Sequence, residues 1–440
     1  MTYTTEKTIA PTAPDAVFER RESEVRSYCR AFPVTFAKAE GSWMSDRDGN
    51  RYLDFLAGCG SLNYGHNDPD MRQALIDYIA GDGVAHGLDM HTDAKERFLK
   101  AFEERILKPR GLDYVMMFTG PTGANAVEAA LKLARLATGR TTVVNFTNGF
   151  HGMTLGALAT TCNGSKRAGA GVPLNDVATA AFDGYFGDDV DTTAMLDRLL
   201  SDPSSGLDHP AAVLVECIQG EGGLNAARAD WLRNLERVCR KHDVLLIVDD
   251  IQAGCGRSGQ YFAFEEAGIE PDMVTQAKSI SGFGLPMALT LVKRELDVFK
   301  PAQHNGTFRG NNHAFVTGAV ALDKFWADDA FAQSVRAKGD IVRRRLAGMA
   351  ERFGRDGDLS LRGRGLMQGI VFPDGEEAGA VCAEAFARGL IIETSGGHDE
   401  VVKILCALTI SEEDLAHGLD ILEAAIEAVR GGAGLKAAAE

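Results

Sequence analysis

Residues 244–252, with the sequence VLLIVDDIQ, form an apolar run that ends in two adjacent aspartates. The run is apolar throughout rather than alternating, which is typical of a parallel strand covered on both faces. Similar runs and intervening amphipathic stretches alternate along the chain. We expect strands at 114–119, 142–146, 211–216 and 272–277, and helices at 124–138 and 229–242. This pattern predicts an α/β fold with a mostly parallel sheet.

The pattern of expected secondary structure changes near both ends of the chain. Residues 41–58 predict a hairpin that turns at Asp48-Gly49-Asn50, and the sequence after residue 325 predicts a charged helix followed by short strands. The expected C-terminal elements are a helix at 330–353 and strands at 361–372 and 401–405. We therefore expect a large domain of residues 70–320 and a smaller α+β domain formed by residues 1–69 and 321–440.

Composition narrows the class of protein. The chain has 440 residues, of which 45% are hydrophobic and 25% charged, as in globular proteins. A net charge of −16 without a basic stripe argues against nucleic acid as a partner. The longest apolar runs are too short to span a bilayer, and the N-terminus lacks a signal-peptide pattern. The 8 scattered cysteines show no zinc spacing, which favours reduced thiols in the cytoplasm and no metal site.

Asp249 and Asp250 end the opening strand. Ligands of open α/β sheets bind beyond the carboxyl ends of strands. Because side chains alternate along a strand, one aspartate can face such a site while the other points away. An ordinary acidic turn is about equally compatible with this pattern.

Two loops could hold parts of a cofactor. In FTGPTGANAVEAALK (118–132), a strand leads through a glycine-rich turn into a helix, whose N-terminus could bind phosphate. The spacing matches neither Walker A nor GxGxxG, and an ordinary strand-to-helix turn remains open. In NGFHGM (148–153), Phe150 could stack on a ring. A packed aromatic and a structural His151 are the alternatives.

Lys278 is the one charged residue between Asp272 and Lys293. A lone amine in an apolar loop is costly unless its charge is removed, although a lysine that reaches water past the loop is the simpler alternative. Pyridoxal phosphate would use all of these groups together. It needs a phosphate-binding site, a ring to stack on, a carboxylate and a lysine, because its aldehyde condenses with an amine.

Six blocks in this order resemble the class III pyridoxal-phosphate aminotransferases. They are TGPTGANAVEAALK, FTNGFHGMT, ECIQGEGG, VDDIQAGCGRSG, QAKSISGFGLP and HNGTFRGNN. The resemblance runs from about Ser23 to at least Ser411 and implies a fold-type I architecture. SEVRSYCRAFPVTF (23–36) and the stretch around HGLDMHT further resemble the members of the family that act in ectoine biosynthesis.

The resemblance also implies roles for individual residues. Lys278 would be the Schiff-base lysine, Asp249 would pair with the ring nitrogen, and Gln252 would reach the phenolic oxygen. The remaining cofactor contacts would come from Phe150 stacking on the ring with His151 beside it, and from Thr122, Gly123 and Ala124 at the phosphate. Thr307 would reach the phosphate of the neighbouring subunit, which implies a homodimer or a higher homo-oligomer. Glu221 resembles an acid that gates a substrate-carboxylate site.

Two positions depart from the family pattern. Lys403 stands where many members have an arginine that holds a substrate carboxylate, and a lysine offers a point charge instead of a bidentate fork. Arg309 stands where many relatives have glycine, and it could compensate for the missing arginine. An interface ion pair is an equally open interpretation of Arg309.

The activity that the resemblance implies is transfer of the 4-amino group between L-2,4-diaminobutyrate and 2-oxoglutarate, giving aspartate 4-semialdehyde and glutamate. Another ω-transaminase, acting on ornithine, acetylornithine or 4-aminobutyrate, is the first alternative. An aminomutase and a cofactor-binding protein without catalysis are two others.

Overall fold

The computed structural model describes residues 9 and 12–437. Its central sheet has seven strands in the order β4-β12-β11-β10-β7-β5-β6. They are β4 (Tyr114–Phe118), β12 (Leu289–Lys293), β11 (Met273–Gln276), β10 (Leu245–Asp249), β7 (Ala212–Val215), β5 (Val143–Phe146) and β6 (Val177–Ala180). β12 is antiparallel to both of its neighbours, and the other pairings are parallel. The predicted α/β class with a mostly parallel sheet is confirmed.

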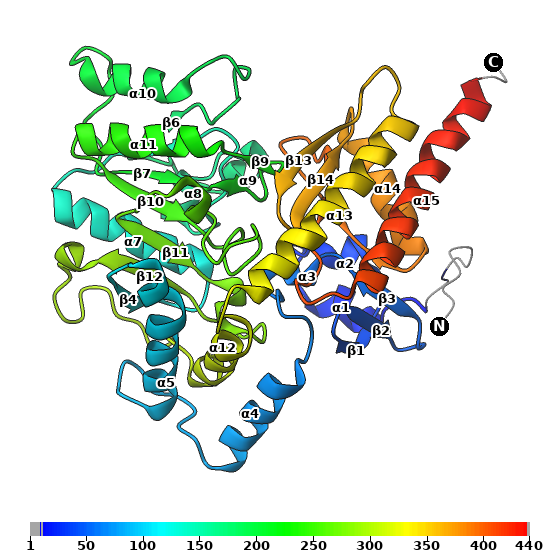
Figure 1. The fold of residues 1–440 in the computed structure, drawn as a ribbon, viewed down its shortest axis with the longest axis horizontal. Helices are drawn as coiled ribbons and strands as arrows, with labels where there is room; N and C mark the ends of the chain where they lie inside the picture. Colours follow the sequence, from blue (N-terminus) through cyan, green and yellow to red (C-terminus); the bar gives the residue numbers. More distant parts are fainter. Residues whose placement is uncertain (1–8, 10–11, 438–440) are drawn as a thin grey trace.

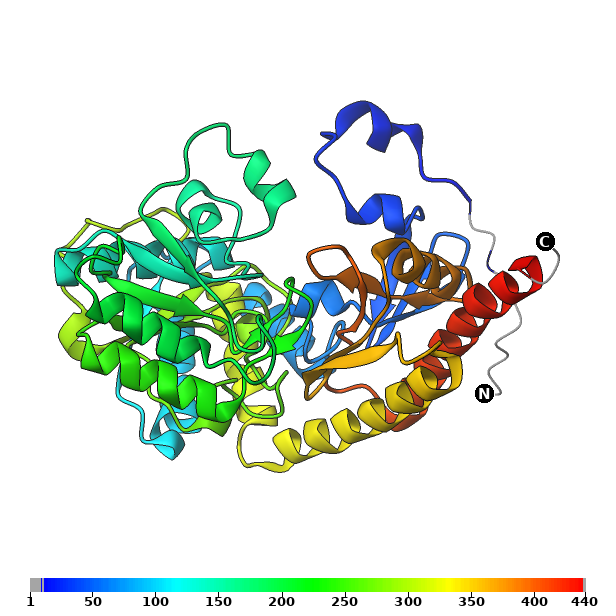
Figure 2. The same ribbon diagram turned by 90° about the horizontal axis from the view of Figure 1, so that it is seen from above.

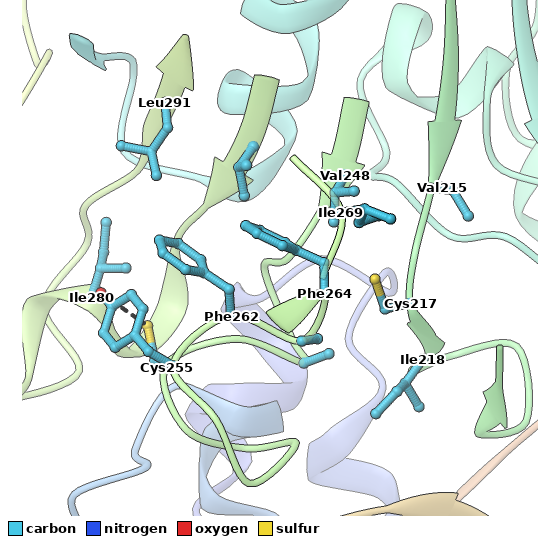
Figure 3. Packing of buried hydrophobic residues seen from close by; sticks show 14 of the residues in the cluster. Val215, Cys217, Ile218, Val248, Cys255, Phe262, Phe264, Ile269, Ile280 and Leu291 are labelled. Carbon is cyan, nitrogen blue, oxygen red and sulfur yellow. Dashed lines mark hydrogen bonds between the residues drawn. The ribbon is translucent and has the colours of Figure 1, made fainter. Parts of the chain in front are cut away.

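Both faces of this sheet are covered, which explains the uninterrupted apolar strands (Figure 1). On β10, Ile247 packs with the helix α7 (Gly123–Thr138) on one face. Its neighbours Leu246 and Val248 belong to a separate core on the other face, together with residues of α5 (Asp93–Phe102), α11 (Ala229–Lys241) and α12 (Asn312–Phe325). Figure 3 shows part of this second core, where Phe262 and Phe264 stack with their centroids 4.9 Å apart.

The remaining elements lie beside this layered body, as Figures 1 and 2 show. Two four-stranded sheets are formed by β1 (Phe36–Glu40), β2 (Trp43–Asp46), β3 (Arg51–Asp54) and β15 (Leu390–Ile391), and by β13 (Ser360–Arg364), β14 (Met367–Val371), β17 (Val401–Ile404) and β16 (Glu393–Ser395). The long helices here are α13 (Ala330–Phe353), α14 (Gly375–Ala387) and α15 (Glu412–Ala437). The predicted hairpin is confirmed as β2 and β3, and the predicted charged helix as α13.

The N-terminal hairpin and the C-terminal elements share one core. β3 pairs in parallel with β15, and Leu53 packs with Leu346 and Leu419. This contact agrees with joining the two ends of the chain in one unit. The domain limits of 1–69 with 321–440 and of 70–320 stay a prediction, and residues 1–8, 10–11 and 438–440 lie outside the described part.

Shorter elements complete the fold. They are α1 (Ala16–Arg21), α2 (Tyr28–Ala31), α3 (Ala57–Gly60), α4 (Pro69–Ala80), α6 (Lys108–Arg110), α8 (Leu155–Ala159), α9 (Gly164–Ala168), α10 (Thr192–Ser201), β8 (Ile218–Gln219) and β9 (Asn225–Ala226). Within the described residues, no helix combines the length and the apolar character needed to cross a bilayer. All eight cysteines lie in that same part of the chain and are free thiols.

Candidate active site

A cavity of about 380 Å³ opens at the carboxyl ends of β5, β10 and β11. It brings together nine of the twelve residues that the sequence singled out. These are Thr122, Gly123, Ala124, Phe150, His151, Glu221, Asp249, Gln252 and Lys278. They come from the N-terminus of α7 and from the loops that follow the central strands, which is where an open α/β sheet binds its ligands.

Lys278 lies one residue beyond β11, after Ala277, and begins a short 3₁₀ helix, Lys278–Ser281. Its φ of 53° lies in the left-handed region, which costs about 1 kcal/mol for a residue other than glycine. The Nζ atom donates a hydrogen bond to the carbonyl of Cys59 at 2.9 Å. Burial lowers the pKa of this amine, and the nearby charge of Glu221 only partly opposes the effect. The cavity therefore makes the charged form of Lys278 less favourable than it is in water.

The two aspartates at the end of β10 separate as strand geometry predicts. Asp249 borders the cavity, and its carboxylate lies 2.7 Å from His151 Nδ1 and accepts a hydrogen bond from Thr275 Oγ1 at 3.1 Å. Asp250 instead accepts the backbone N–H of Ala263 at 3.2 Å. One acid is thus held inside the cavity by polar neighbours, and the other stabilises a loop.

His151 supports Asp249 from a buried position. Burial by itself would lower the pKa of the imidazole, but the hydrogen bond to Asp249 and the charge of that carboxylate outweigh it and raise the pKa. Either protonation state allows Nδ1–H to donate to Asp249. The contact orients the carboxylate, which is a structural role of the kind considered for His151 from the sequence.

The N-terminus of α7 faces the same cavity. Thr122 N donates to Asn125 Oδ1 at 3.2 Å, and the first-turn N–H groups of a helix have no partner within the helix. The α7 helix has 16 residues, so its positive end favours an anion here. A Cβ at Gly123 would lie 2.9 Å from Ile251 Cδ1, so a larger residue here would displace that side chain. These features suit a phosphate.

Gln252 reaches into the cavity from the loop after β10. Its Nε2 donates to the Cys59 carbonyl at 3.2 Å and to Glu221 Oε1 at 3.1 Å. Among the described residues its Oε1 has no hydrogen-bond partner although it is buried. A buried acceptor in this state calls for a donor from a bound group. Gly220 keeps the space for this side chain, since a Cβ there would lie only 1.7 Å from Gln252 Oε1.

Lys403 lies behind the cavity and is fully buried. Its Nζ lies 3.0 Å from Glu221 Oε1 and 2.9 Å from Glu393 Oε1. Burial would lower the pKa of Lys403, but the two carboxylates raise it above its ordinary value. Burial likewise acts to raise the pKa of Glu221, but the ammonium groups of Lys403 and Lys278 lower it to about 2.

Three charged residues near the cavity were not predicted. Glu216 directly follows β7 and accepts the backbone N–H groups of Phe150 at 2.9 Å and Gly220 at 3.2 Å. Burial raises the pKa of Glu216 to about 7. The rule that selected Asp249, an acid at a strand end, could also have selected Glu216. Lys166 and Glu393 carry no such signal. Lys166 Nζ lies 4.5 Å from the ring centroid of Phe150.

Thr307 and Arg309 do not reach this cavity in the single chain. Both lie in a turn segment near Phe308, whose side chain is 65% exposed. Arg309 Nη1 donates to Asn305 Oδ1 at 3.2 Å. A second cavity of about 340 Å³ involves Phe308 and shares Pro121 and Pro286 with the first. The roles predicted for Thr307 and Arg309 remain predictions.

Comparisons with known proteins extend over nearly the whole chain. The sequence profile of the family described as Aminotransferase class-III matches residues 26–426. Proteins named diaminobutyrate–2-oxoglutarate transaminase are similar to this chain. The one from Nocardia farcinica is 57% identical over 95% of both chains, and the one from Halomonas elongata is 56% identical over 92% of this chain and 97% of its own. Among solved structures, the ornithine aminotransferase from Toxoplasma gondii matches with a TM-score of 0.81 at 26% identity, covering 95% of each chain.

Proposed function

The chain belongs to the class III aminotransferases, and from this membership we infer that it exchanges the 4-amino group between L-2,4-diaminobutyrate and 2-oxoglutarate. The products in that direction are L-aspartate 4-semialdehyde and L-glutamate. Relatives at 55–57% identity over most of the chain are named for this reaction. The ornithine aminotransferase of similar fold is far more distant at 26% identity, which favours diaminobutyrate over ornithine as the donor.

The cofactor is pyridoxal 5′-phosphate, which supplies an aldehyde for amines and an electron-withdrawing ring when it is bound. The residues of the cavity fit this group. The N-terminus of α7 offers a phosphate-binding site, and Asp249 offers a carboxylate. Lys278 offers an amine whose pKa is lowered by burial. The partnerless Oε1 of Gln252 offers an acceptor to a hydroxyl group. The meeting of these groups in one cavity is the observation that carries the proposal.

We assign the cofactor contacts on this basis. Asp249, held by His151, would pair with the ring nitrogen, and Phe150 would pack against the ring. Gln252 would reach the phenolic oxygen. At the phosphate we assign Thr122, Gly123 and Ala124 of this chain, together with Thr307 of a neighbouring copy.

Lys278 is the central residue of the proposed mechanism. Its Nζ would hold the cofactor, and the same amine would serve as the base when it is free. The lowered pKa allows Nζ to accept the proton that leaves C4 of the donor. Asp249 is held in place by His151 Nδ1 and by the hydroxyl of Thr275, which donates to it. Since the two substrates use the same cavity in turn, we expect ping-pong kinetics.

The substrate carboxylates need cations, and two are available. Lys403 is paired with Glu221, so a carboxylate that displaces Glu221 would gain the Lys403 charge. Arg309 is the second candidate, acting from its surface segment in an oligomer. Both assignments are proposals that follow from charge and position.

We also propose the setting of the enzyme. The sequence blocks shared with ectoine-pathway members support a role in ectoine biosynthesis, with siderophore supply as the alternative. Eight free thiols support the cytoplasm as its location. The exposed Phe308 beside Thr307 supports a homodimer. A second copy would bury Phe308, and its cofactor phosphate would accept a contact from Thr307.

A panel of amino donors with 2-oxoglutarate tests the reaction. We expect kcat/KM for L-2,4-diaminobutyrate to exceed that for L-ornithine, N-acetyl-L-ornithine and 4-aminobutyrate. Glutamate should form in equal amount to the semialdehyde. A higher kcat/KM for another donor, or turnover without a 2-oxo acid, would contradict the proposal.

A further inference from the structure

The buried ammonium group of Lys403 forms ion pairs with two carboxylates beside the cavity. Lys403 Nζ lies 3.0 Å from Glu221 and 2.9 Å from Glu393, and its side chain is fully buried. The side chains of Glu221 and Glu393 are 23% and 13% exposed. With all three groups ionised, the cluster carries one negative charge more than its lysine can balance. A buried charge without a full partner is costly, so this excess favours a cationic ligand.

The two carboxylates are not equivalent. Glu393 on β16 and Lys403 on β17 lie directly opposite each other in an antiparallel pair, so the sheet itself fixes their contact. Glu221 comes from the loop after β8, outside that sheet. Glu393 is therefore the built-in partner of Lys403, and Glu221 is the more independent one.

The carboxylates also differ in what they face. Glu221 borders the cavity together with Lys278, whereas Glu393 and Lys403 do not. The Oε1 atom of Glu221 already accepts hydrogen bonds from Lys403 and from Gln252. No hydrogen bond within the described residues is recorded to its Oε2 atom, so Glu221 is the part of the cluster that a substrate can contact.

The donor of the proposed reaction carries a matching charge. When C4 of L-2,4-diaminobutyrate lies at Lys278, its second ammonium group is two carbons away along the chain. In the loaded enzyme Lys278 is committed to the cofactor and no longer offers its own ammonium to Glu221. The site then has an excess anion where this donor has an excess cation.

We propose that Glu221 binds the C2 ammonium group of the donor, and that Glu393 is a positioning residue that holds Lys403 and so leaves the charge of Glu221 available. The inference rests on the proposed function and adds the basis of its specificity. The site selects diamino acids, because a donor without the second ammonium group leaves the excess charge unpaired. 4-Aminobutyrate is the matched comparison, since it lacks only the C2 amino group.

The test uses the cofactor-loaded enzyme and its Glu393→Gln variant. In the wild type, kcat/KM should favour L-2,4-diaminobutyrate over 4-aminobutyrate with the same acceptor. In Glu393→Gln, Lys403 has Glu221 as the one remaining carboxylate of the two and neutralises it more fully. The ratio of the two kcat/KM values should therefore drop about tenfold, which corresponds to the loss of one hydrogen bond to a charged group. The loss should appear in KM for diaminobutyrate more than in kcat.

Two variants separate this effect from general damage. Glu393→Asp keeps the charge and should retain most of the preference. Glu384→Gln removes a carboxylate on α14 from its partly exposed pair with Arg388 and should leave the preference unchanged. Circular dichroism and the absorbance of bound cofactor check that each variant folds and loads.

The outcomes distinguish the two levels of the argument. A wild-type enzyme that does not prefer diaminobutyrate overturns both the proposed function and this inference. A wild-type preference that Glu393→Gln keeps within twofold overturns the inference alone. A preference that falls in Glu393→Gln and survives in Glu393→Asp supports both.

Discussion

Replacing Glu216 with glutamine should change how the stability of the protein depends on pH. Glu216 is buried, accepts two backbone N–H groups, and has a pKa raised by burial from 4.5 to about 7. In the unfolded chain the carboxyl ionises near its ordinary value. Between these two pH values the folded protein keeps a proton that the unfolded chain releases. The free energy of unfolding contributed by this group therefore falls as the pH rises from 4.5 to 7.

The size of the effect follows from the displacement of the pKa. One pKa unit corresponds to about 1.4 kcal/mol, so the wild type loses about 3 kcal/mol of stability from Glu216 between pH 4.5 and pH 7. Glutamine does not ionise and removes this loss. Its amide NH₂ cannot accept the second backbone N–H, which costs about 1–3 kcal/mol at every pH. Relative to the wild type, the variant should be destabilised at pH 5 and should recover by about 3 kcal/mol by pH 8.

Equilibrium urea unfolding of both proteins at several pH values between 5 and 8 measures this difference. Glu384→Gln, the same change of carboxylate to amide in the partly exposed pair with Arg388, serves as the control. A stability difference between Glu216→Gln and the wild type that stays constant across this range would refute the reasoning. It would mean that burial does not raise the pKa of Glu216 into this pH range.

Two other substitutions test the proposed contacts to cofactor and substrate. Gly220→Ala would place a Cβ 1.7 Å from Gln252 Oε1 and displace that side chain. The Kd for pyridoxal phosphate should then rise about tenfold, as expected for one lost hydrogen bond. Titration of the protein with cofactor, followed by absorbance, measures this Kd, and an unchanged value would exclude Gln252 as a cofactor contact. Arg309→Ala should raise KM for 2-oxoglutarate about tenfold if Arg309 binds a substrate carboxylate. Steady-state kinetics decide this case, and an unchanged KM would assign Arg309 to the surface alone.

Much of the fold follows from local sequence, as β10 illustrates. Leu246, Ile247 and Val248 are all apolar because the strand is covered on both faces, and this property is visible in the sequence. The antiparallel strand β12 was not predicted. Its direction depends on pairing with β4, which is about 170 residues away in sequence. An apolar run does not by itself specify whether a strand pairs parallel or antiparallel.

The site shows the same division. Asp249 was predicted because it ends a strand, and Lys278 because its charge is isolated in the sequence. Glu393 was missed because its role depends on lying opposite Lys403 across two strands, which local sequence does not specify. Cys59 was not singled out for this site either, since its contribution is a backbone carbonyl that accepts from Lys278 and Gln252. Side-chain chemistry is readable from a sequence, whereas backbone contacts and cross-strand partners require the fold.

The most direct test of the account is to identify which lysine carries the cofactor. Purified protein saturated with pyridoxal phosphate would be reduced with borohydride, digested and analysed by mass spectrometry. The account predicts one dominant pyridoxyl phosphate adduct, on the peptide that contains Lys278, and its loss together with transaminase activity in Lys278→Ala. A dominant adduct on Lys403, Lys166 or another lysine, or full turnover by Lys278→Ala, would contradict the account.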